Sequence, residues 1–245
     1  MSPTDELARS YLDLRWHFDP AAGSLEGAHE QDNRLGMFDA ASVREHLAAF
    51  RSLEAAAEAL DVESPDEEID RTALIDEIRV AMFRLQHERP GARNPARWVG
   101  HLAEALAPPR AEGRRGGGAE GQALLSRLRA VPAFLQSAEA SLTEPAEPLV
   151  DLAAELIEPV ADLITRRLAE HGDDAELYPQ LREAAMSAEG ALARFRLALD
   201  TEIREQSETH APGAGEEQFE RLLHHQHAVR GGAPDLWRQI LRLEE

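Results

Sequence analysis

The chain has 245 residues, of which 43% are hydrophobic, so it is long enough to bury a core without metals or disulfides. It contains no cysteine, which excludes disulfide scaffolds, cysteine–zinc sites and thiol nucleophiles. Its 46 acidic and 26 basic residues give a formal net charge of −20, and a surface this acidic repels nucleic-acid phosphates and anionic lipids. Nucleic acid and membrane are therefore excluded as expected partners.

No targeting or membrane segment is evident. The N-terminal residues MSPTDELARS lack a basic region followed by an apolar core, and no run approaches the roughly 20 apolar residues of a membrane span. Together with the absence of cysteine, this indicates a cytoplasmic protein. The sequence leaves its oligomeric state open.

Helical periodicity recurs along the chain, whereas alternating runs of β-branched and polar residues do not, so the sequence predicts an all-α multi-helix bundle. A first helix is expected around residues 5–17. Residues 19–38 are rich in Gly and Asp and are expected to form a long loop. Ser42 and Glu45 then form a capping box for a helix that reaches about Leu60.

The next helix has the clearest ends. Ser64 is a good N-cap, Pro65 suits the first turn, and Glu67 completes a capping box. An apolar stripe follows at spacings of three and four residues, comprising Ile75, Ile78, Met82 and Leu85. The helix should end before Pro90, and Asn94–Pro95 should start another one.

The second half is expected to contain two long helices. Apolar spacing marks one over residues 149–163, with Pro159 inside it, and another over residues 181–199. We expect them to pack as an antiparallel hairpin, followed by short terminal helices at 216–228 and 234–243. The predicted organisation is an N-terminal helical segment 1–107, a flexible Gly/Pro-rich loop 108–121, a hairpin segment 122–210, and terminal helices 211–245.

Four segments in this order resemble the first half of the bacterial domain-of-unknown-function 885 (DUF885) family. They are GAHEQDNRLGMF (residues 27–38), EIDR with its helix and the ERPGARNP exit (68–95), LRAVPAFLQSAEASL (128–142) and GEEQFERLL (215–223). The resemblance spans nearly the whole chain. One departure lies in the exit turn, where relatives usually carry aromatic residues and this chain has Gly91–Ala92.

The resemblance implies a longer, zinc-metallopeptidase-like protein whose second half carries a His-Glu-x-x-His helix. Such a site needs two histidines one turn apart with a glutamate between them as general base. The pairs His29–Glu30 and His87–Glu88 both lack the second histidine, and Pro90 would break the second helix. We therefore expect this chain alone to be noncatalytic and to have no cofactor. The implied partner is a HExxH-bearing catalytic half or a peptide ligand.

Polar residues that flank the family-like helix are the candidates for contacts in a ligand cleft: Arg71, Arg89, Arg93 and Asn94. Arginine forks recognise carboxylates such as a peptide C-terminus. They equally well satisfy buried acids or carbonyl groups at helix C-termini. The structural use is the favoured interpretation.

Three residues near the C-terminus could share a helix face and act as metal ligands: Glu220, His224 and His227. The HExxH spacing is absent and no other residues obviously complete a site. A surface patch is the favoured interpretation, so no metal site is predicted. A self-contained metal-dependent hydrolase that uses these histidines stays as a third hypothesis.

Two functional hypotheses lead. In the first, the chain is a noncatalytic helical module that forms one wall of a substrate cleft, with a separate or missing catalytic half. In the second, it is a free-standing helical binding or scaffold protein. Exposure of the apolar residues of the terminal helices would favour the first, and these interface candidates are Phe219, Leu222, Leu223, Trp237, Ile240 and Leu241.

Overall fold

The computed structural model describes residues 2–62, 64–107, 117–209, 215–227, 229 and 231–243. Every named element of these residues is a helix, and extended pairing among them is limited to one isolated bridge between Ala146 and Glu208. The predicted all-α class is confirmed. In this described part of the chain, no helix is long and apolar enough to span a bilayer.

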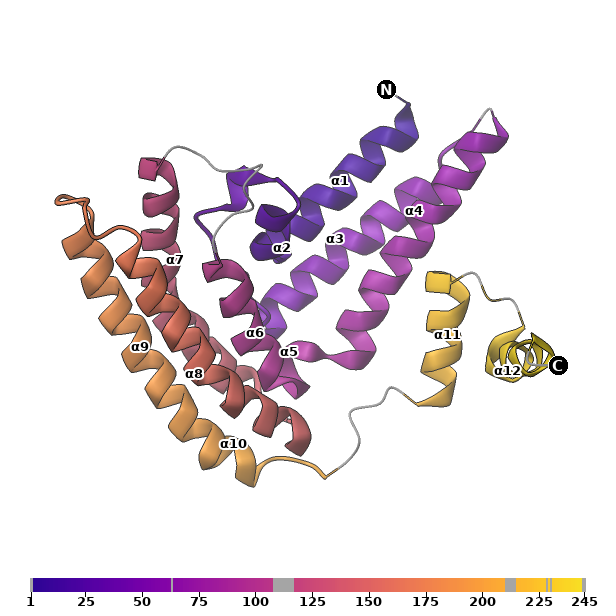
Figure 1. Cartoon of the computed structure of the whole chain (residues 1–245). Coiled ribbons are helices and arrows are strands. Elements are labelled where there is room, and N and C mark those ends of the chain that lie inside the picture. Colours follow the sequence, from indigo (N-terminus) through magenta and orange to yellow (C-terminus); the bar gives the residue numbers. More distant parts are fainter. Residues whose placement is uncertain are drawn as a thin grey trace. The chain divides into compact units, whose positions relative to one another are not determined.

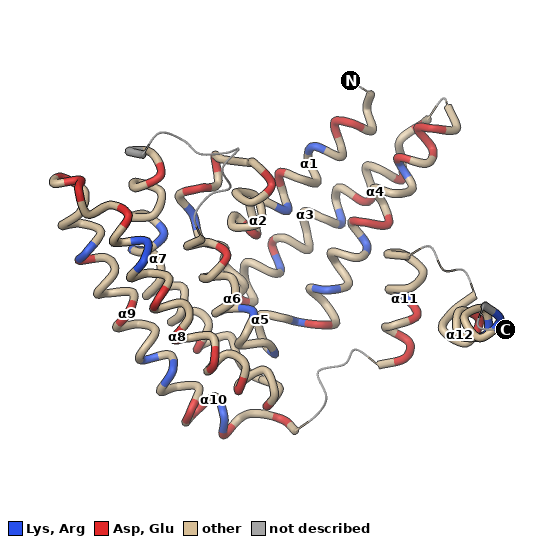
Figure 2. Tube along the Cα trace, viewed as in Figure 1, with Lys and Arg blue, Asp and Glu red and all other residues tan. Residues whose placement is uncertain are grey.

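The chain forms two compact units. Unit 1 combines residues 1–14, 44–89 and 213–245, and unit 2 combines residues 15–43 and 90–212. The segment 1–107 therefore contributes to both units, and the residues of α1 (Pro3–Phe18) and α3 (Ala40–Glu58) are divided between them. Acidic residues occur along the helices of both units (Figure 2).

Unit 1 contains most of α1 and α3, together with α4 (Pro65–Phe83), η2 (Arg84–Glu88), α11 (Glu216–His227) and α12 (Gly232–Leu243). Its core includes the ring of Tyr11 at 5.7 Å from that of Phe50, which also lies 4.3 Å from the ring of His46. Helix α11 packs against α4 and contacts α12.

The caps of α3 and α4 differ in how well they follow from the sequence. Ser64 Oγ accepts a hydrogen bond of 3.2 Å from the Glu67 N–H, as predicted. For α3, however, Asp39 is the cap, because its carboxylate accepts from the N–H groups of Ala41 and Ser42 and from the Ser42 hydroxyl. The predicted Ser42–Glu45 box is therefore wrong, and the helix begins earlier than expected.

The predicted apolar stripe on α4 needs a correction. Ile78 and Met82 are buried, but Ile75 and Leu85 are only half-buried. The buried face instead includes Leu74, Ile78, Val80, Met82 and Phe83. Adjacent positions at the C-terminal end are buried together, so this end of α4 is covered on more than one face.

The helix ends before Pro90, as predicted. A π-helical turn, η2, extends it to Glu88, and Arg89 then adopts the left-handed conformation with φ 47°. Only after this residue do Pro90–Arg93 form α5, and Asn94 caps α6 (Pro95–Leu106) by accepting from the Arg97 N–H at 3.0 Å. The predicted cap at Asn94 is confirmed.

Unit 2 contains α2 (Pro20–Leu25), η1 (His29–Gln31), α5, α6, α7 (Gly117–Ser141), α8 (Glu147–Ala169), α9 (Tyr178–Asp200) and α10 (Glu202–Glu205). The predicted long helices are α8 and α9, which run antiparallel and in contact (Figure 1). Helix α7 is a third long helix. It packs against α9 and contributes Leu128, Val131 and Phe134 to the core.

Two predicted loops are partly helical. Within residues 19–38, Asp19 caps α2 through a 3.1 Å hydrogen bond from the Ala22 N–H, and Pro20 occupies the first turn. Within residues 108–121, positions 108–116 lie outside the described residues, whereas 117–121 form the first turns of α7. At Gly121 a Cβ atom would meet the side chains of Leu177 and His171, so glycine permits close packing there.

Candidate functional site

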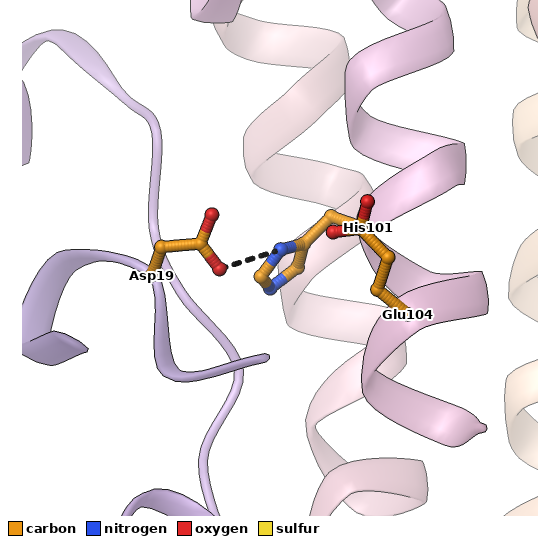
Figure 3. Close-up of side chains that lie close together, drawn as sticks. All are labelled: Asp19, His101 and Glu104. Atoms are coloured by element: carbon orange, nitrogen blue, oxygen red, sulfur yellow. Dashed lines mark ion pairs between the residues drawn. The ribbon is translucent and has the colours of Figure 1, made fainter. Parts of the chain in front are cut away.

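Three potential metal-ligating side chains converge in unit 2. Asp19, His101 and Glu104 bring one ligand atom each to within 4.8 Å of one another, and they are the one such group among the described residues (Figure 3). Asp19 comes from the cap of α2, whereas His101 and Glu104 lie on α6. The exposed fractions of their side chains are 16% for Asp19, 0% for His101 and 43% for Glu104.

The imidazole of His101 has a polar neighbour at each of its ring nitrogens. Its Nε2 accepts a 3.2 Å hydrogen bond from the Gly36 N–H, and its Nδ1 lies 3.4 Å from Asp19 Oδ1. Because a backbone N–H can only donate, the neutral ring must carry its proton on Nδ1, where it faces the carboxylate. Burial lowers the pKa of His101 to about 4, against the opposing charge of Asp19. The ring is therefore neutral at pH 7.

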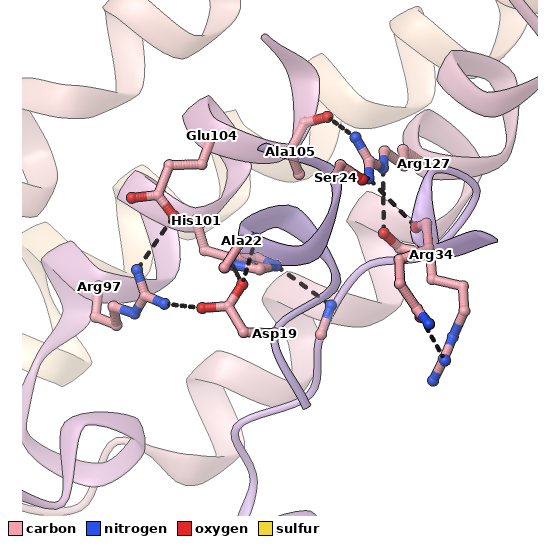
Figure 4. Close-up of polar contacts among 11 residues, drawn as sticks. Asp19, Ala22, Ser24, Arg34, Arg97, His101, Glu104, Ala105 and Arg127 are labelled. Carbon is pink, nitrogen blue, oxygen red and sulfur yellow. Dashed lines mark hydrogen bonds and ion pairs between the residues drawn. The ribbon is translucent and has the colours of Figure 1, made fainter. Parts of the chain in front are cut away.

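The positively charged guanidinium of Arg97 already pairs with the carboxylates of Asp19 and Glu104. Its Nη2 donates to Asp19 Oδ2 and its Nη1 donates to Glu104 Oε2 at 3.2 Å (Figure 4). The guanidinium also lies over the ring of Phe38, 5.4 Å from the centroid. A planar, permanently charged fork suits such a bridge between two carboxylates.

This arrangement is poorly suited to a metal ion. A metal bound at Nδ1 of a neutral His101 would require the proton on Nε2, where it would oppose the N–H of Gly36. The metal would also have to displace Arg97 from Asp19 and Glu104. The chemistry of these donors therefore fits a structural ion-pair network that joins α6 to the cap of α2.

Arg127 on α7 makes a second buried polar link. Its guanidinium donates to the carbonyl oxygens of Ala105 at 2.5 Å, Arg34 at 3.2 Å and Gln31 at 3.3 Å, and to Ser24 Oγ at 2.5 Å (Figure 4). Burial lowers its pKa to about 10. Arg127 thus remains charged at pH 7 and fixes the segment around Arg34 against α6 and α7.

An aromatic cluster fills the space beside this network. The ring of Phe38 lies 5.4 Å from Trp98, 4.9 Å from His101 and 6.0 Å from Phe134. The Trp98 indole N–H donates to the Gly91 carbonyl at 3.0 Å. Three of the family-like segments therefore meet here, those that carry Phe38, Gly91 and Phe134. Their contacts are those of a packed core.

The four predicted ligand-cleft residues are divided between the two units. Arg71, in unit 1, donates to the Leu60 carbonyl at 2.8 Å and pairs with Glu68 at 2.7 Å. Asn94, in unit 2, is the cap of α6. Both are therefore used structurally. Arg89 is exposed in unit 1, and Arg93, half-buried in unit 2, accepts a backbone hydrogen bond from Ala146 at its own carbonyl.

The weak metal-ligand candidates near the C-terminus do not converge. Although all three residues are described, Glu220, His224 and His227 do not bring their ligand atoms together. The neighbouring His225 pairs with Asp76 through Nδ1 at 2.7 Å.

The interface candidates divide into two groups. Phe219, Trp237, Ile240 and Leu241 are 51%, 62%, 40% and 46% exposed, and we call these four residues the terminal apolar set. Leu223 is buried and Leu222 is half-buried, because α11 packs against α4.

Sequence reasoning missed the network around His101. A signal was available, because Arg97, His101 and Glu104 are spaced by four and three residues and share a helix face. Asp19 before Pro20 also had the pattern of a helix cap. Nothing local to either segment indicated that they meet across 78 residues.

Fold and site together define an all-helical protein in which a partly buried polar network joins α6 to the cap of α2. The chain matches the model of the family described as bacterial protein of unknown function (DUF885) over residues 20–234, and it belongs to that family. No curated protein matches the chain.

Among solved structures, the chain is similar to a protein from Shewanella oneidensis that is provisionally described as a lipoprotein of unknown function. The TM-score is 0.82 at 15% sequence identity, so the likeness is one of fold. The match covers 98% of this chain but 45% of the Shewanella chain. The present chain thus spans less than half of that structure.

Proposed function

We propose that this chain is a noncatalytic helical module that shapes one wall of a substrate cleft, and that a HExxH-bearing half supplies the chemistry. The sequence contains no HExxH motif. The family resemblance and the 45% coverage of the Shewanella structure support a role as part of a larger architecture.

The observation that carries this proposal is the terminal apolar set. Four of the nine large hydrophobic side chains that are exposed in the described residues belong to α11 and α12. Exposed apolar side chains that gather in one part of a chain are typical of surfaces that another chain or segment covers. The occupant we propose is the counterpart of the part of the Shewanella structure that this chain does not match.

Co-expression tests the proposal. The chain is produced with HExxH-bearing polypeptides encoded in the same genome, and copurification, zinc content and peptide hydrolysis are measured. We expect one of them to copurify and only the complex to cleave peptides. Substituting Phe219→Glu, Trp237→Glu and Leu241→Glu together should abolish copurification, because charges would be buried without partners.

Met186→Glu with Leu197→Glu is the matched control. These side chains are 64% and 65% exposed on α9, outside the terminal apolar set. The complex should survive this change. If no HExxH-bearing polypeptide binds and the chain is a zinc-free monomer, the proposal fails and a free-standing binding or scaffold role replaces it.

A further inference from the structure

A cavity of about 190 Å³ lies within unit 1, between α4 with η2 on one side and α11 on the other. Apolar side chains of Val80, Met82, Phe83 and Leu222 line part of it. Val80, Met82 and Phe83 are buried and α11 packs on α4, so the floor of the cavity belongs to the core of the unit.

The titratable residues that line this cavity are all bases: Arg79, His87, Arg221 and His225. The remaining polar lining residue, Gln86, is neutral. The chain carries 46 acids against 26 arginines and lysines and 10 histidines. A lining without a carboxylate is therefore the opposite of the average surface of this molecule. The lining thus offers N–H donors of basic side chains, from which the oxygens of an anionic ligand can accept hydrogen bonds.

Carboxylates outside the lining pair with three of these bases: Glu54 and Glu58 with Arg79, Glu217 with Arg221, and Asp76 with His225. Arg79 donates through Nε to Glu54 and through Nη2 to Glu58, both at 2.7 Å, and this leaves Nη1 outside the two pairs. His225 contacts Asp76 through Nδ1 at 2.7 Å, which leaves its Nε2 outside that pair. Because these ion pairs already fix the basic side chains, less conformational entropy is lost when a ligand binds.

The backbone at the cavity is unusual. The π-helical turn η2 places the ring of His87 on that of Phe83, with centroids 4.9 Å apart and planes at 28°. π-Helical turns are rare and frequently occur at functional sites. The turn adds a flat, basic ring beside the apolar floor.

We infer that this cavity binds a small organic anion, whose carboxylate contacts the bases and whose apolar body contacts Val80, Phe83 and Leu222. The volume suits a body of about one six-membered ring, since pockets for drug-sized ligands are roughly 300 Å³ or larger. This site is separate from the network around His101 and does not depend on the proposed cleft function.

Titration of the whole chain with benzoate tests the inference, with the imidazole proton resonances of His87 and His225 followed by NMR. We expect saturable shifts with a Kd on the order of 1 mM, as suits a ligand of this size. Benzyl alcohol has the ring without the charge, and inorganic phosphate has charge without the ring. Both should bind at least about tenfold more weakly.

The double variant Arg221→Gln/His87→Gln should weaken benzoate binding about tenfold. Arg238→Gln/His227→Gln removes the same residue types from exposed positions that do not line the cavity, so it should change the Kd by less than about twofold. Circular dichroism checks that both variants keep their helices. Equal binding of benzyl alcohol or of phosphate, an unchanged Kd in the first variant, or no saturable shift up to about 20 mM would each overturn the inference.

Discussion

Burial governs the protonation of His101. The native ring has a pKa of about 4, whereas an exposed histidine has a pKa near 6.5. Between these values the unfolded chain binds a proton that the native state does not. Folding stability must therefore fall as the pH falls from about 6.5 towards 4.

We expect this residue alone to remove about 2 kcal/mol of stability between pH 7.5 and pH 5. His101→Gln should lower stability at pH 7.5 but flatten the pH dependence in this window, because glutamine does not titrate. Urea unfolding at several pH values measures both effects. A variant with the same pH slope as the parent would show that other histidines cause the dependence.

Gly91 permits a close approach of two backbone segments. A Cβ atom at this position would meet the Phe38 carbonyl oxygen well inside van der Waals distance. Gly91→Ala should therefore force the backbone of α5 away from Phe38 and cost about 2–3 kcal/mol.

Gly100→Ala is the matched control, because nothing lies within 4 Å of a Cβ at that position inside α6. Alanine there should stabilise the protein by about 0.5–1 kcal/mol through helix propensity and chain entropy. Chemical denaturation of both variants measures the difference. Equal effects of the two changes would contradict the close approach at Gly91.

At the scale of single helices, the capping residue of α4 offers a clean test. Ser64 accepts from the Glu67 N–H, and its replacement by alanine should cost about 1 kcal/mol. Ser52 is also exposed and helical, but its hydroxyl donates back to the Ala48 carbonyl of α3. Ser52→Ala should therefore change the free energy of unfolding by less than about 0.5 kcal/mol. Equal losses in the two variants would refute the cap.

The helices that the sequence predicts best are those with a side-chain cap or a long apolar period. Ser64 and Asn94 specify their helices locally, and α8 and α9 have long apolar faces, so all four follow from neighbouring residues. The short helix after Asp19 was missed, because glycine and acidic residues obscured its cap. Its six residues gain their stability from tertiary contacts.

The candidate site was less predictable because it, too, depends on tertiary contacts. Arg97 and Glu104 share a face of α6, but their partner Asp19 lies far away in the sequence. Arg71 looked equally suited to ligand binding until its partners, the Leu60 carbonyl and Glu68, were seen. A polar side chain acquires its role from groups that only the fold brings near it.

At the scale of the whole molecule, net charge dominates the electrostatics. With a formal charge of −20 at pH 7, the compact state is destabilised by self-repulsion. Most of the ion pairs in the described residues are partly exposed, as in Arg204–Asp151 and Arg221–Glu217, and such pairs contribute little. Screening by salt should therefore weaken the repulsion between like charges more than it weakens the attraction within the ion pairs.

We accordingly expect the Tm at pH 7.5 to rise by several degrees as NaCl increases from about 20 to 300 mM, where the Debye length shortens to below 10 Å. Near pH 5 the net charge is close to zero, because the isoelectric point is about 4.9, and the same addition of salt should change the Tm little. Differential scanning calorimetry at both pH values makes the comparison. If salt lowers the Tm at pH 7.5, the ion pairs outweigh the repulsion, and networks such as Arg79 with Glu54 and Glu58 must stabilise the fold more than their exposure indicates.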